Sequence, residues 1–451
     1  MKNDGSNQTA AGEKNMKRNR ILNALLCSAA AMSMAACSSG APAEDASGSA
    51  GESADKITVW AWDETFNIKA MEVAKEMYAK ENPDLDIEIV TMSQDDIVQK
   101  LNTSLSSGKV DGLPNIVLIE DYRIQGYLNS YPDSFEDLTS IVNEEDFMSY
   151  KFAVNKIGDK IYGVPFDSGV AGLFYRTDYI EEAGYTMDDM QDITWSKYIE
   201  IGKAVKEKTG HEMLTLDPSD LGQIRMMLQS ADSWYMDADG KTVTLEGNET
   251  LKKAIETYKD IVDSGISKQV ADWDSFVSAF QNGDVASVPT GCWIGSSIEK
   301  AEDLSGKWAI APFPRLDGVE KSVNASSIGG GGWYVVKGLP GNDQAIDFLS
   351  KTFATSEELM DQLATDISLV STLKAAADTE TYKKPVAFFS DEPIFENFSN
   401  WAEKVPSVNY GLHTYTIEDI LTEAIQAYVQ GGDLDEALKQ AQQQAEGAVA
   451  Y

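Results

Sequence analysis

The amino-acid sequence predicts an α/β fold that contains a parallel β-sheet. The first observation is an alternation of apolar, strand-like runs with amphipathic, helix-like stretches between residues 57 and 120. The second is the return of this alternation after residue 168. Parallel strands need crossover connections, which are usually helices, so the alternation favours βαβ units. A chain of 451 residues is long enough for two such domains or for one large one.

The first part of the chain supplies three predicted strands and two predicted helices. Residues 57–62 are β-branched, aromatic and apolar, which indicates a buried strand. Asn67 is expected to cap the helix that follows, and residues 87–90 form the second strand. Ser93 begins a second helix, with acidic residues in its first turn, where the helix dipole favours them. Residues 114–121, PNIVLIED, form the third strand.

The second part of the chain continues the pattern. Residues 169–184 predict a strand and a short helix, and Thr194 is expected to cap an amphipathic helix that buries Trp195. Further helices are expected within 250–265 and 272–291, the latter running into a strand.

Two glycine-containing turns complete the second part. Asp239-Gly240 lies between two extended stretches, which is a hairpin signal. The last segment, 416–449, reads as two helices on either side of Gly431-Gly432.

The N-terminal segment has the parts of a secretory signal. A basic cluster ends at Arg20, residues 21–34 are apolar, and Ala-Ala precedes Cys37. The cysteine resembles that of a bacterial lipobox, so residues 1–36 are predicted to be a signal peptide and Cys37 to be lipidated. An ordinary signal peptide with an incidental cysteine is the alternative, and Met16 is an alternative start. Residues 37–55 consist mostly of Ser, Gly, Ala, Pro, Glu and Asp, which is typical of a flexible tether.

Charge and composition exclude several classes of function. The formal net charge is −36, which disfavours binding to nucleic acid and electrostatic docking on anionic lipid. Of the cysteines, only Cys292 lies beyond the signal and the lipobox, so no disulfide framework is expected. His211 and His413 are far apart, and no Cys/His cluster has metal-binding spacing. We expect neither a cofactor nor a metal.

Several motifs in the chain resemble those of the extracellular solute-binding proteins that feed bacterial ABC importers for oligosaccharides. The motifs, in order, are ITVWAWDETFN, PNIVLIEDYR, KIYGVPFDSGVAGLFYRTDYIEEAG, FQNGDVASVPTGCWIGSSIE, WAIAPFPRLDG, GGGGWYVVKG and AIDFLSKTFATSEELMDQLA. The resemblance spans residues 55–451 and rests on the order and spacing of the motifs rather than on any one of them.

The resemblance implies a two-lobe α/β fold like that of periplasmic binding proteins, with the ligand in a cleft between the lobes. It places the N-terminal lobe at 56–167 plus 326–371 and the C-terminal lobe at 168–325 plus 372–451. Hinge crossings are expected near Phe166–Gly169, Ala325–Ile328 and Val370–Thr372. The expected protein is a monomeric lipoprotein on the extracellular face of the cell membrane, with an oligosaccharide ligand and permease subunits as partners.

The candidate ligand-binding residues follow strand ends or are aromatic. Ligands of open α/β sheets bind beyond the carboxyl ends of strands. Aromatic faces stack on the apolar side of a sugar ring, and carboxylates accept hydrogen bonds from hydroxyls. Trp60 and Trp62 point to opposite faces of a strand, so Trp60 is expected in the core and Trp62 near the cleft. The predicted ligand-binding residues are Trp62, Asp63, Glu64, Glu120, Asp121, Tyr122, Phe166, Asp167, Trp234, Trp293, Gly331 and Trp333.

Some alternative interpretations of these residues and motifs stay open, and others fail. Asp63 and Asp121 could cap a helix or hold a turn instead of touching a ligand. Gly329–Gly332 lacks the Gly-Lys-Ser/Thr ending of a phosphate loop, and the DADG stretch lacks the final glutamate of an EF-hand. Adjacent acids such as Glu120 and Asp121 would suit a surface glycoside hydrolase, which is one alternative function, and a protein-binding adhesin is another. The WAWDETFN stretch resembles family members that handle xylo- or manno-oligosaccharides.

Overall fold

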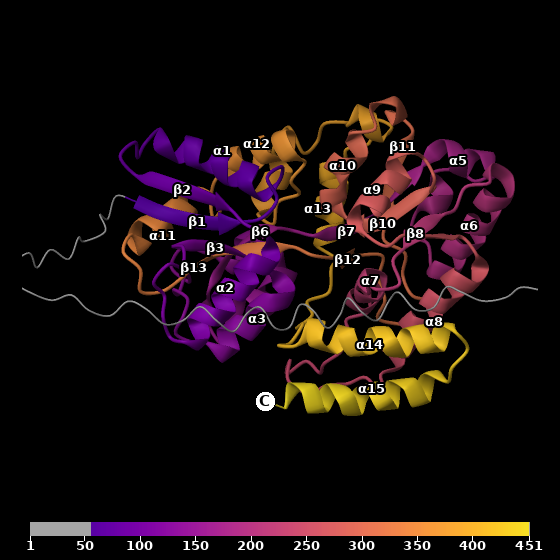
Figure 1. Ribbon diagram of the computed structural model, residues 1–451. Coiled ribbons are helices and arrows are strands. Elements are labelled where there is room, and N and C mark those ends of the chain that lie inside the picture. Colours follow the sequence, from indigo (N-terminus) through magenta and orange to yellow (C-terminus); the bar gives the residue numbers. More distant parts are fainter. Residues whose placement is uncertain (1–55, 451) are drawn as a thin grey trace, which may run out of the picture. The chain divides into compact units, whose positions relative to one another are not determined.

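A computed structural model describes residues 56–450, and these residues belong to one compact unit (Figure 1). The predicted signal peptide, the lipidation of Cys37 and the tether lie outside the described residues. Within 56–450, no helix is both long enough and apolar enough to cross a membrane.

The first sheet has five strands in the order β2-β1-β3-β13-β6. Its strands are β1 Lys56–Ala61, β2 Asp86–Thr91, β3 Ile116–Glu120, β6 Gly163–Asp167 and β13 Gly331–Val335. Strand β1 pairs in parallel with β2 and β3, which confirms the predicted parallel arrangement of the first three strands. Strand β13 lies between β3 and β6 and is antiparallel to both, so the sheet is mixed.

Five helices of ten or more residues belong to the part of the chain around this sheet. They are α1 Asn67–Ala79, α2 Gln94–Ser106, α3 Asp121–Ser130, α11 Asn342–Lys351 and α12 Glu357–Ile367. Ser93 caps α2 as predicted, because its side chain accepts a hydrogen bond from the Asp96 N–H at 3.1 Å. The predicted cap at Asn67 is wrong: the N-cap position is Phe66, and Asn67 is the first residue inside α1.

The second sheet is antiparallel and has the order β10-β7-β11, with β12 also paired to β7. Its strands are β7 Val170–Arg176, β10 Ser287–Gly291, β11 Trp308–Pro312 and β12 Ser326–Ser327. Two small pairs complete the strands: β4 Lys156–Ile157 with β5 Lys160–Ile161, and β8 Leu214–Leu216 with β9 Ser267–Gln269. The predicted hairpin at Asp239-Gly240 is reduced to a turn closed by one bridge between Met236 and Val243.

The remaining α-helices are α4 Phe152–Asn155, α5 Thr177–Glu182, α6 Trp195–Thr209, α7 Gly222–Ser230, α8 Glu249–Ser264, α9 Trp273–Gln281, α10 Gly295–Glu299, α13 Ile394–Ala402, α14 Thr414–Val429 and α15 Leu434–Val449. Thr194 caps α6, and Trp195 is completely buried, as predicted. Helices α14 and α15 pack side by side around Gly431-Gly432, which confirms the two predicted C-terminal helices (Figure 1).

The chain passes between the two sheets in three adjacent segments. Strand β6 ends at Asp167 and β7 begins at Val170, whereas β12 ends at Ser327 and β13 begins at Gly331. The third segment bridges Ser371 to Asp167. The first two segments are joined by the Ile328 N–H, which donates to the carbonyl of Gly169 at 2.8 Å. These segments coincide with the expected crossings, except that Ser326 and Ser327 still pair with the second sheet. The exact division into two lobes stays a prediction.

Candidate functional site

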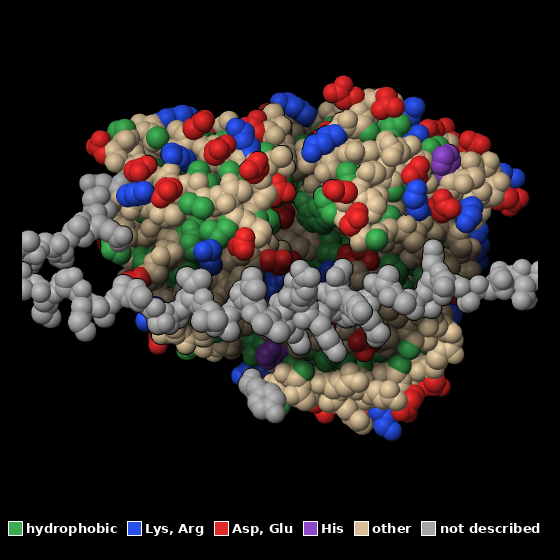
Figure 2. Space-filling view, in the orientation of Figure 1, with side chains coloured by type: hydrophobic (Ala, Val, Ile, Leu, Met, Phe, Trp, Pro, Cys, Tyr) green, Lys and Arg blue, Asp and Glu red, His purple; other side chains and the backbone are tan. Residues whose placement is uncertain are grey.

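A two-chambered cavity lies at the carboxyl ends of β1 and β3 and faces helices α9 and α10. The small chamber has a volume of about 220 Å³ and the large chamber about 700 Å³. The large chamber lies within the range of about 300–1,000 Å³ that small-molecule sites occupy. Figure 2 shows a hollow on this side of the molecule, around which hydrophobic and acidic side chains gather. The residues common to both chambers are Trp62, Gln94, Glu120, Trp273, Trp293 and Gly329.

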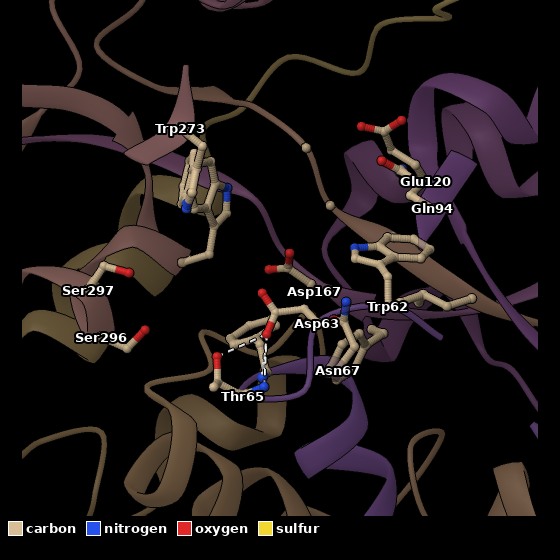
Figure 3. Close-up of a pocket in the computed structure, with 17 residues that line it drawn as sticks. Trp62, Asp63, Thr65, Asn67, Gln94, Glu120, Asp167, Trp273, Ser296 and Ser297 are labelled. Atoms are coloured by element: carbon tan, nitrogen blue, oxygen red, sulfur yellow. Dashed lines mark hydrogen bonds between the residues drawn. The ribbon is translucent and has the colours of Figure 1, made fainter. Parts of the chain in front are cut away.

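Three tryptophans form aromatic walls of the cavity. Trp62 follows β1, and Trp273 begins α9, on the opposite side of the cavity (Figure 3). The ring of Trp293 lies 5.9 Å from that of Trp273, with their planes tilted by 35°. Trp60 is buried in the core while Trp62 lines the cavity, as the alternation of side chains along a strand predicts. Indole rings therefore line the cavity from two sides, and such rings can stack on the apolar face of a ligand.

The position of Trp293 depends on a neighbouring glycine. Any Cβ at Gly291 would lie 2.1 Å from the indole nitrogen of Trp293, so only glycine lets the ring fold back at this point. The indole N–H donates to the carbonyl of Ile328 at 3.1 Å, in the second crossing segment. The edge of the ring is thereby held while the side chain lines both chambers.

Asp63 combines a turn with a place in the small chamber. Its backbone is left-handed, with φ of 59°, and its Oδ1 accepts hydrogen bonds from the N–H groups of Thr65 at 2.9 Å and Phe66 at 3.0 Å. The turn alternative for Asp63 is therefore present in the structure. The side chain is also exposed and lines the small chamber beside Asp167 (Figure 3).

Asp167 and Phe166 end strand β6 beneath the small chamber. Asp167 Oδ1 accepts a hydrogen bond from the Gly169 N–H at 3.0 Å, and burial raises the pKa of this carboxyl. Phe166 lines the small chamber but is 1% exposed, and its ring packs on Trp333 at 5.3 Å. Phe166 consequently forms an apolar floor rather than a freely presented stacking face.

Glu120 ends β3 and lines both chambers. Its Oε2 accepts a hydrogen bond from the Tyr415 hydroxyl at 2.6 Å and lies 3.4 Å from Arg123 Nε. Gln94, the first residue of α2, lies close to Glu120 on the Trp62 side of the cavity (Figure 3). The carboxylate of Glu120 can accept hydrogen bonds from ligand hydroxyls, and the amide of Gln94 can both donate and accept them.

Asp121, by contrast, does not line either chamber. Its side chain is buried and forms an ion pair with Lys151, which is also completely buried. Lys151 Nζ donates in addition to the carbonyl of Asp167 at 2.8 Å. Burial raises the pKa of Asp121 to about 6, although the ammonium group of Lys151 acts in the opposite direction. The prediction that Asp121 binds ligand is corrected, because α3 turns this carboxylate toward the crossing segments.

Three other predicted residues also lie outside both chambers. Trp234 is 2% exposed, its ring stacks on Tyr122 at 5.7 Å, and its indole N–H donates to Thr414. Trp333 is completely buried in the core beneath the first sheet. Glu64 is exposed but lies outside the cavity lining. We therefore remove these three residues from the site. The predicted residues that the structure brings together are Trp62, Asp63, Glu120, Tyr122, Phe166, Asp167, Trp293 and Gly331.

Several lining residues were missed by the sequence analysis. Gln94 could have been found, because it follows Ser93 just beyond the carboxyl end of β2, where the same rule about strand ends applies. Ser296 and Ser297 lie on α10, a few residues after Trp293, and nothing in their local sequence pattern indicates that they line a cavity. The other missed lining residues with polar side chains are Thr65, Asn67, Thr215, Asp217, Asp220, Gln223, Arg225, Asp272, Thr290 and Tyr415.

The cavity lining is acidic. Among the lining residues that the structure describes, Arg225 is the one cation, whereas six residues are acidic. The acidic residues are Asp63, Glu120, Asp167, Asp217, Asp220 and Asp272. Arg225 is itself paired with Asp220 at 2.9 Å and lies 3.5 Å from Glu418. An anionic ligand would therefore be repelled by most charged groups of the lining, and Arg225 is already paired with carboxylates. Over residues 56–450, no cluster of three or more His, Cys, Asp or Glu side chains is arranged to hold a metal.

Comparison with known protein families gives one match over most of the chain. The family described as bacterial extracellular solute-binding protein matches residues 74–390. The lactose-binding protein of Rhizobium radiobacter is 43% identical over 396 residues, which cover 88% of this chain and 93% of that protein. The arabinooligosaccharide-binding protein of Bacillus subtilis (strain 168) is 27% identical over 329 residues, covering 71% of this chain and 73% of the relative.

Solved structures show the same fold. The sugar-binding protein MalE from the phytopathogen Xanthomonas citri matches with a TM-score of 0.72 at 19% identity, covering 88% of this chain and 97% of that chain. The ABC transporter associated binding protein from B. animalis subsp. lactis Bl-04, in complex with beta-1,6-galactobiose, matches with a TM-score of 0.70 at 20% identity, covering 88% and 98%. At this level of identity the likeness concerns the fold.

Proposed function

Because the chain belongs to the family of bacterial extracellular solute-binding proteins, and is thus a binding protein rather than an enzyme, we propose that it captures a neutral oligosaccharide for an ABC importer. The bound sugar is handed to the membrane permease of that importer. The observation that carries this proposal is the cavity, which Trp62 lines on one side and Trp273 on the other (Figure 3), with Trp293 and several carboxylates also in its lining.

Both chemical features of the cavity suit a sugar. Indole rings stack on the apolar faces of pyranose rings, and ionised carboxylates accept hydrogen bonds from several hydroxyls. The excess of carboxylates over cations favours neutral sugars and disfavours uronic or phosphorylated ones. Lactose is the first candidate ligand, because the relative named as a lactose-binding protein is 43% identical over most of both chains.

Closure of the cavity is part of the proposal. The two sheets meet at three crossing segments, and left-handed glycines stand in two of them, Gly169 with φ of 59° and Gly330 with φ of 84°. A sugar that touches Trp62 on one side and Trp293 on the other would favour the closed arrangement by its additional contacts there. The predicted lobes, N-terminal and C-terminal, would move as two bodies about these segments.

A calorimetric panel tests the binding proposal. The purified protein is titrated with lactose, galactobiose, arabino-oligosaccharides, xylo- and manno-oligosaccharides, and an acidic galacturonate oligosaccharide as the charged control. We expect saturable binding of at least one neutral sugar, no binding of the acidic one, and no new reducing ends on long incubation. Binding of none of them would refute the proposal and leave the adhesin alternative. Steady release of reducing ends would refute the binding-only role.

The membrane anchor is a separate part of the proposal. Lipidation of Cys37 would hold the protein on the extracellular face of the membrane, with residues 38–55 as a tether. Cys37→Ala is expected to release the protein into the medium or to leave it unprocessed. Normal processing with unchanged, detergent-extractable membrane retention would contradict lipidation without affecting the sugar-binding proposal.

A further inference from the structure

The Glu120 carboxylate in the cavity lining accepts a hydrogen bond from a residue of the C-terminal helices. Its partner, the hydroxyl of Tyr415, lies 2.6 Å from Oε2, although 295 positions separate the two residues in the chain. Glu120 ends β3 of the first sheet, whereas Tyr415 lies in α14, which packs on α8 and α15. The bond therefore joins the first sheet to the helices of the C-terminal part of the chain.

The ring of Tyr415 is held on several sides. The guanidinium of Arg123 lies 4.1 Å from the ring centroid, and that of Arg225 lies 5.9 Å from it. The ring of Tyr122 meets it edge-on at 6.3 Å. Burial raises the pKa of the Tyr415 hydroxyl, so this group stays protonated and donates its proton to the carboxylate of Glu120. Cation–π contacts of this kind add to the rigidity of the arrangement.

The hydrogen bond fixes the rotation of the Glu120 carboxylate. Tyr415 and Arg123 both approach Oε2, and the side chain of Glu120 is 14% exposed and lines both chambers. With Oε2 occupied in this way, Oε1 is the oxygen left to accept from a ligand hydroxyl. A carboxylate that is already oriented loses less rotamer freedom when a ligand binds, and preorganisation of this kind raises affinity.

We propose that Tyr415 is a positioning residue that orients Glu120 for the ligand and does so only when α14 is docked against the end of β3. The inference rests on the proposed function, since it concerns the affinity of the same cavity for sugar. It links the docking of α14 at the end of β3 to the orientation of the Glu120 carboxylate in the cavity lining. Affinity for sugar thus depends on a residue whose hydroxyl acts through Glu120.

The test compares two Tyr→Phe variants by titration with lactose or, where another sugar of the panel binds more tightly, with that sugar. Tyr415→Phe removes the hydroxyl and keeps the ring with its cation–π contacts. Tyr78→Phe is the matched control, because the Tyr78 hydroxyl donates to Asp347 at 2.6 Å, far from both chambers. Loss of a hydrogen bond to a charged group predicts about tenfold weaker sugar binding for Tyr415→Phe. The affinity of Tyr78→Phe should equal that of the parent.

A double-mutant cycle shows whether Tyr415 acts through Glu120. In a Glu120→Ala background, Tyr415→Phe should have no further effect on affinity, because the group that it orients is gone. If Glu120→Ala leaves no measurable binding, Glu120→Gln provides the cycle, and the effect of Tyr415→Phe should then be reduced. An equal loss with and without Glu120 would overturn the inference, as it would show direct contact of Tyr415 with the sugar.

The remaining outcomes separate the inference from the proposed function. If the parent protein binds sugar and Tyr415→Phe binds it equally well, the positioning role is refuted while the proposed function stands. If both Tyr→Phe variants lose affinity alike, the effect is one of general stability and the positioning role is again refuted. If the parent binds no sugar of the panel, the proposed function fails, and the inference fails with it.

Discussion

Replacement of Lys151 by methionine should strongly destabilise the protein near neutral pH. The side chains of Lys151 and Asp121 are 0% and 4% exposed, so the two charges are almost fully removed from water. Methionine keeps most of the side-chain volume but leaves the Asp121 carboxylate buried without its counter-ion. The Oδ1 atom of Asp121 has no hydrogen-bond partner within the described residues even with Lys151 present. Removal of one partner of a buried pair costs about 3–5 kcal/mol of unfolding free energy.

The pH dependence of the defect gives a second readout. Burial raises the pKa of Asp121 to about 6 in the parent, and loss of the ammonium group must raise it further. Protonation then removes the uncompensated charge, so the deficit of Lys151→Met should shrink as the pH falls through that raised pKa. The carbonyl of Asp167 also loses its 2.8 Å donor, and this part of the loss does not titrate.

Urea denaturation followed by tryptophan fluorescence measures both effects. The control is Lys252→Met, which removes the lysine from a surface pair with the exposed Asp435 and should change stability by less than about 1 kcal/mol. A loss below about 1 kcal/mol for Lys151→Met would refute the reasoning, because a buried, uncompensated carboxylate cannot be so well tolerated. A deficit of equal size at acidic and neutral pH would refute the assignment of the loss to Asp121.

Three further predictions concern the cavity wall, the crossing segment and the response to pH. Trp293→Ala should weaken sugar binding by about 2–4 kcal/mol, or on the order of 30- to 1,000-fold, and unchanged calorimetric affinity would exclude Trp293 from the site. Gly330→Ala should lower the melting temperature more than Gly318→Ala does. Both glycines have positive φ, 84° for Gly330 and 74° for Gly318, so both substitutions strain the backbone. A Cβ at Gly330 would also lie 2.9 Å from Asp121 Oδ2, whereas a Cβ at Gly318 would have no atom within 4 Å. Equal losses of melting temperature would show that this crowding is unimportant. Burial raises the pKa of Glu392 from 4.5 to about 7, so its stabilising contribution is complete below 4.5 and is lost as the pH rises through 7. Because Glu392 is half-buried, Glu392→Gln should reduce the change of unfolding free energy between pH 4.5 and 7 by only about 1–2 kcal/mol. Urea denaturation at several pH values measures this change, and an unaltered pH dependence would show that Glu392 is not its source.

Local signals account for what the sequence predicted well. Caps at Ser93 and Thr194 are visible in the sequence because a side-chain oxygen precedes an amphipathic run, and the structure contains both bonds. The rule that ligands bind beyond strand ends selected Trp62 and Glu120, and both line the cavity, since each directly follows or ends a strand that the apolar pattern defines. These features depend on a few neighbouring residues.

Features that depend on distant parts of the chain could not be predicted. Asp121 immediately follows Glu120, yet it pairs with Lys151, and no local pattern distinguishes the two carboxylates. Trp234 is buried because Tyr122 and Tyr410 cover it, and both lie far away in the sequence. The antiparallel insertion of β13 likewise depends on pairing with strands formed much earlier in the chain.

Strand β13 also governs the order in which the first sheet can be completed. Strands β3 and β6 are made early, but in the sheet they are separated by Gly331–Val335. Each of them keeps an unpaired edge until residue 335 has been synthesised, and pairing between distant segments is intrinsically slow. The N-terminal half of the chain therefore cannot close into a finished domain on its own. Under the proposed export, this delay would keep the nascent chain open for translocation and let it fold on the far side of the membrane.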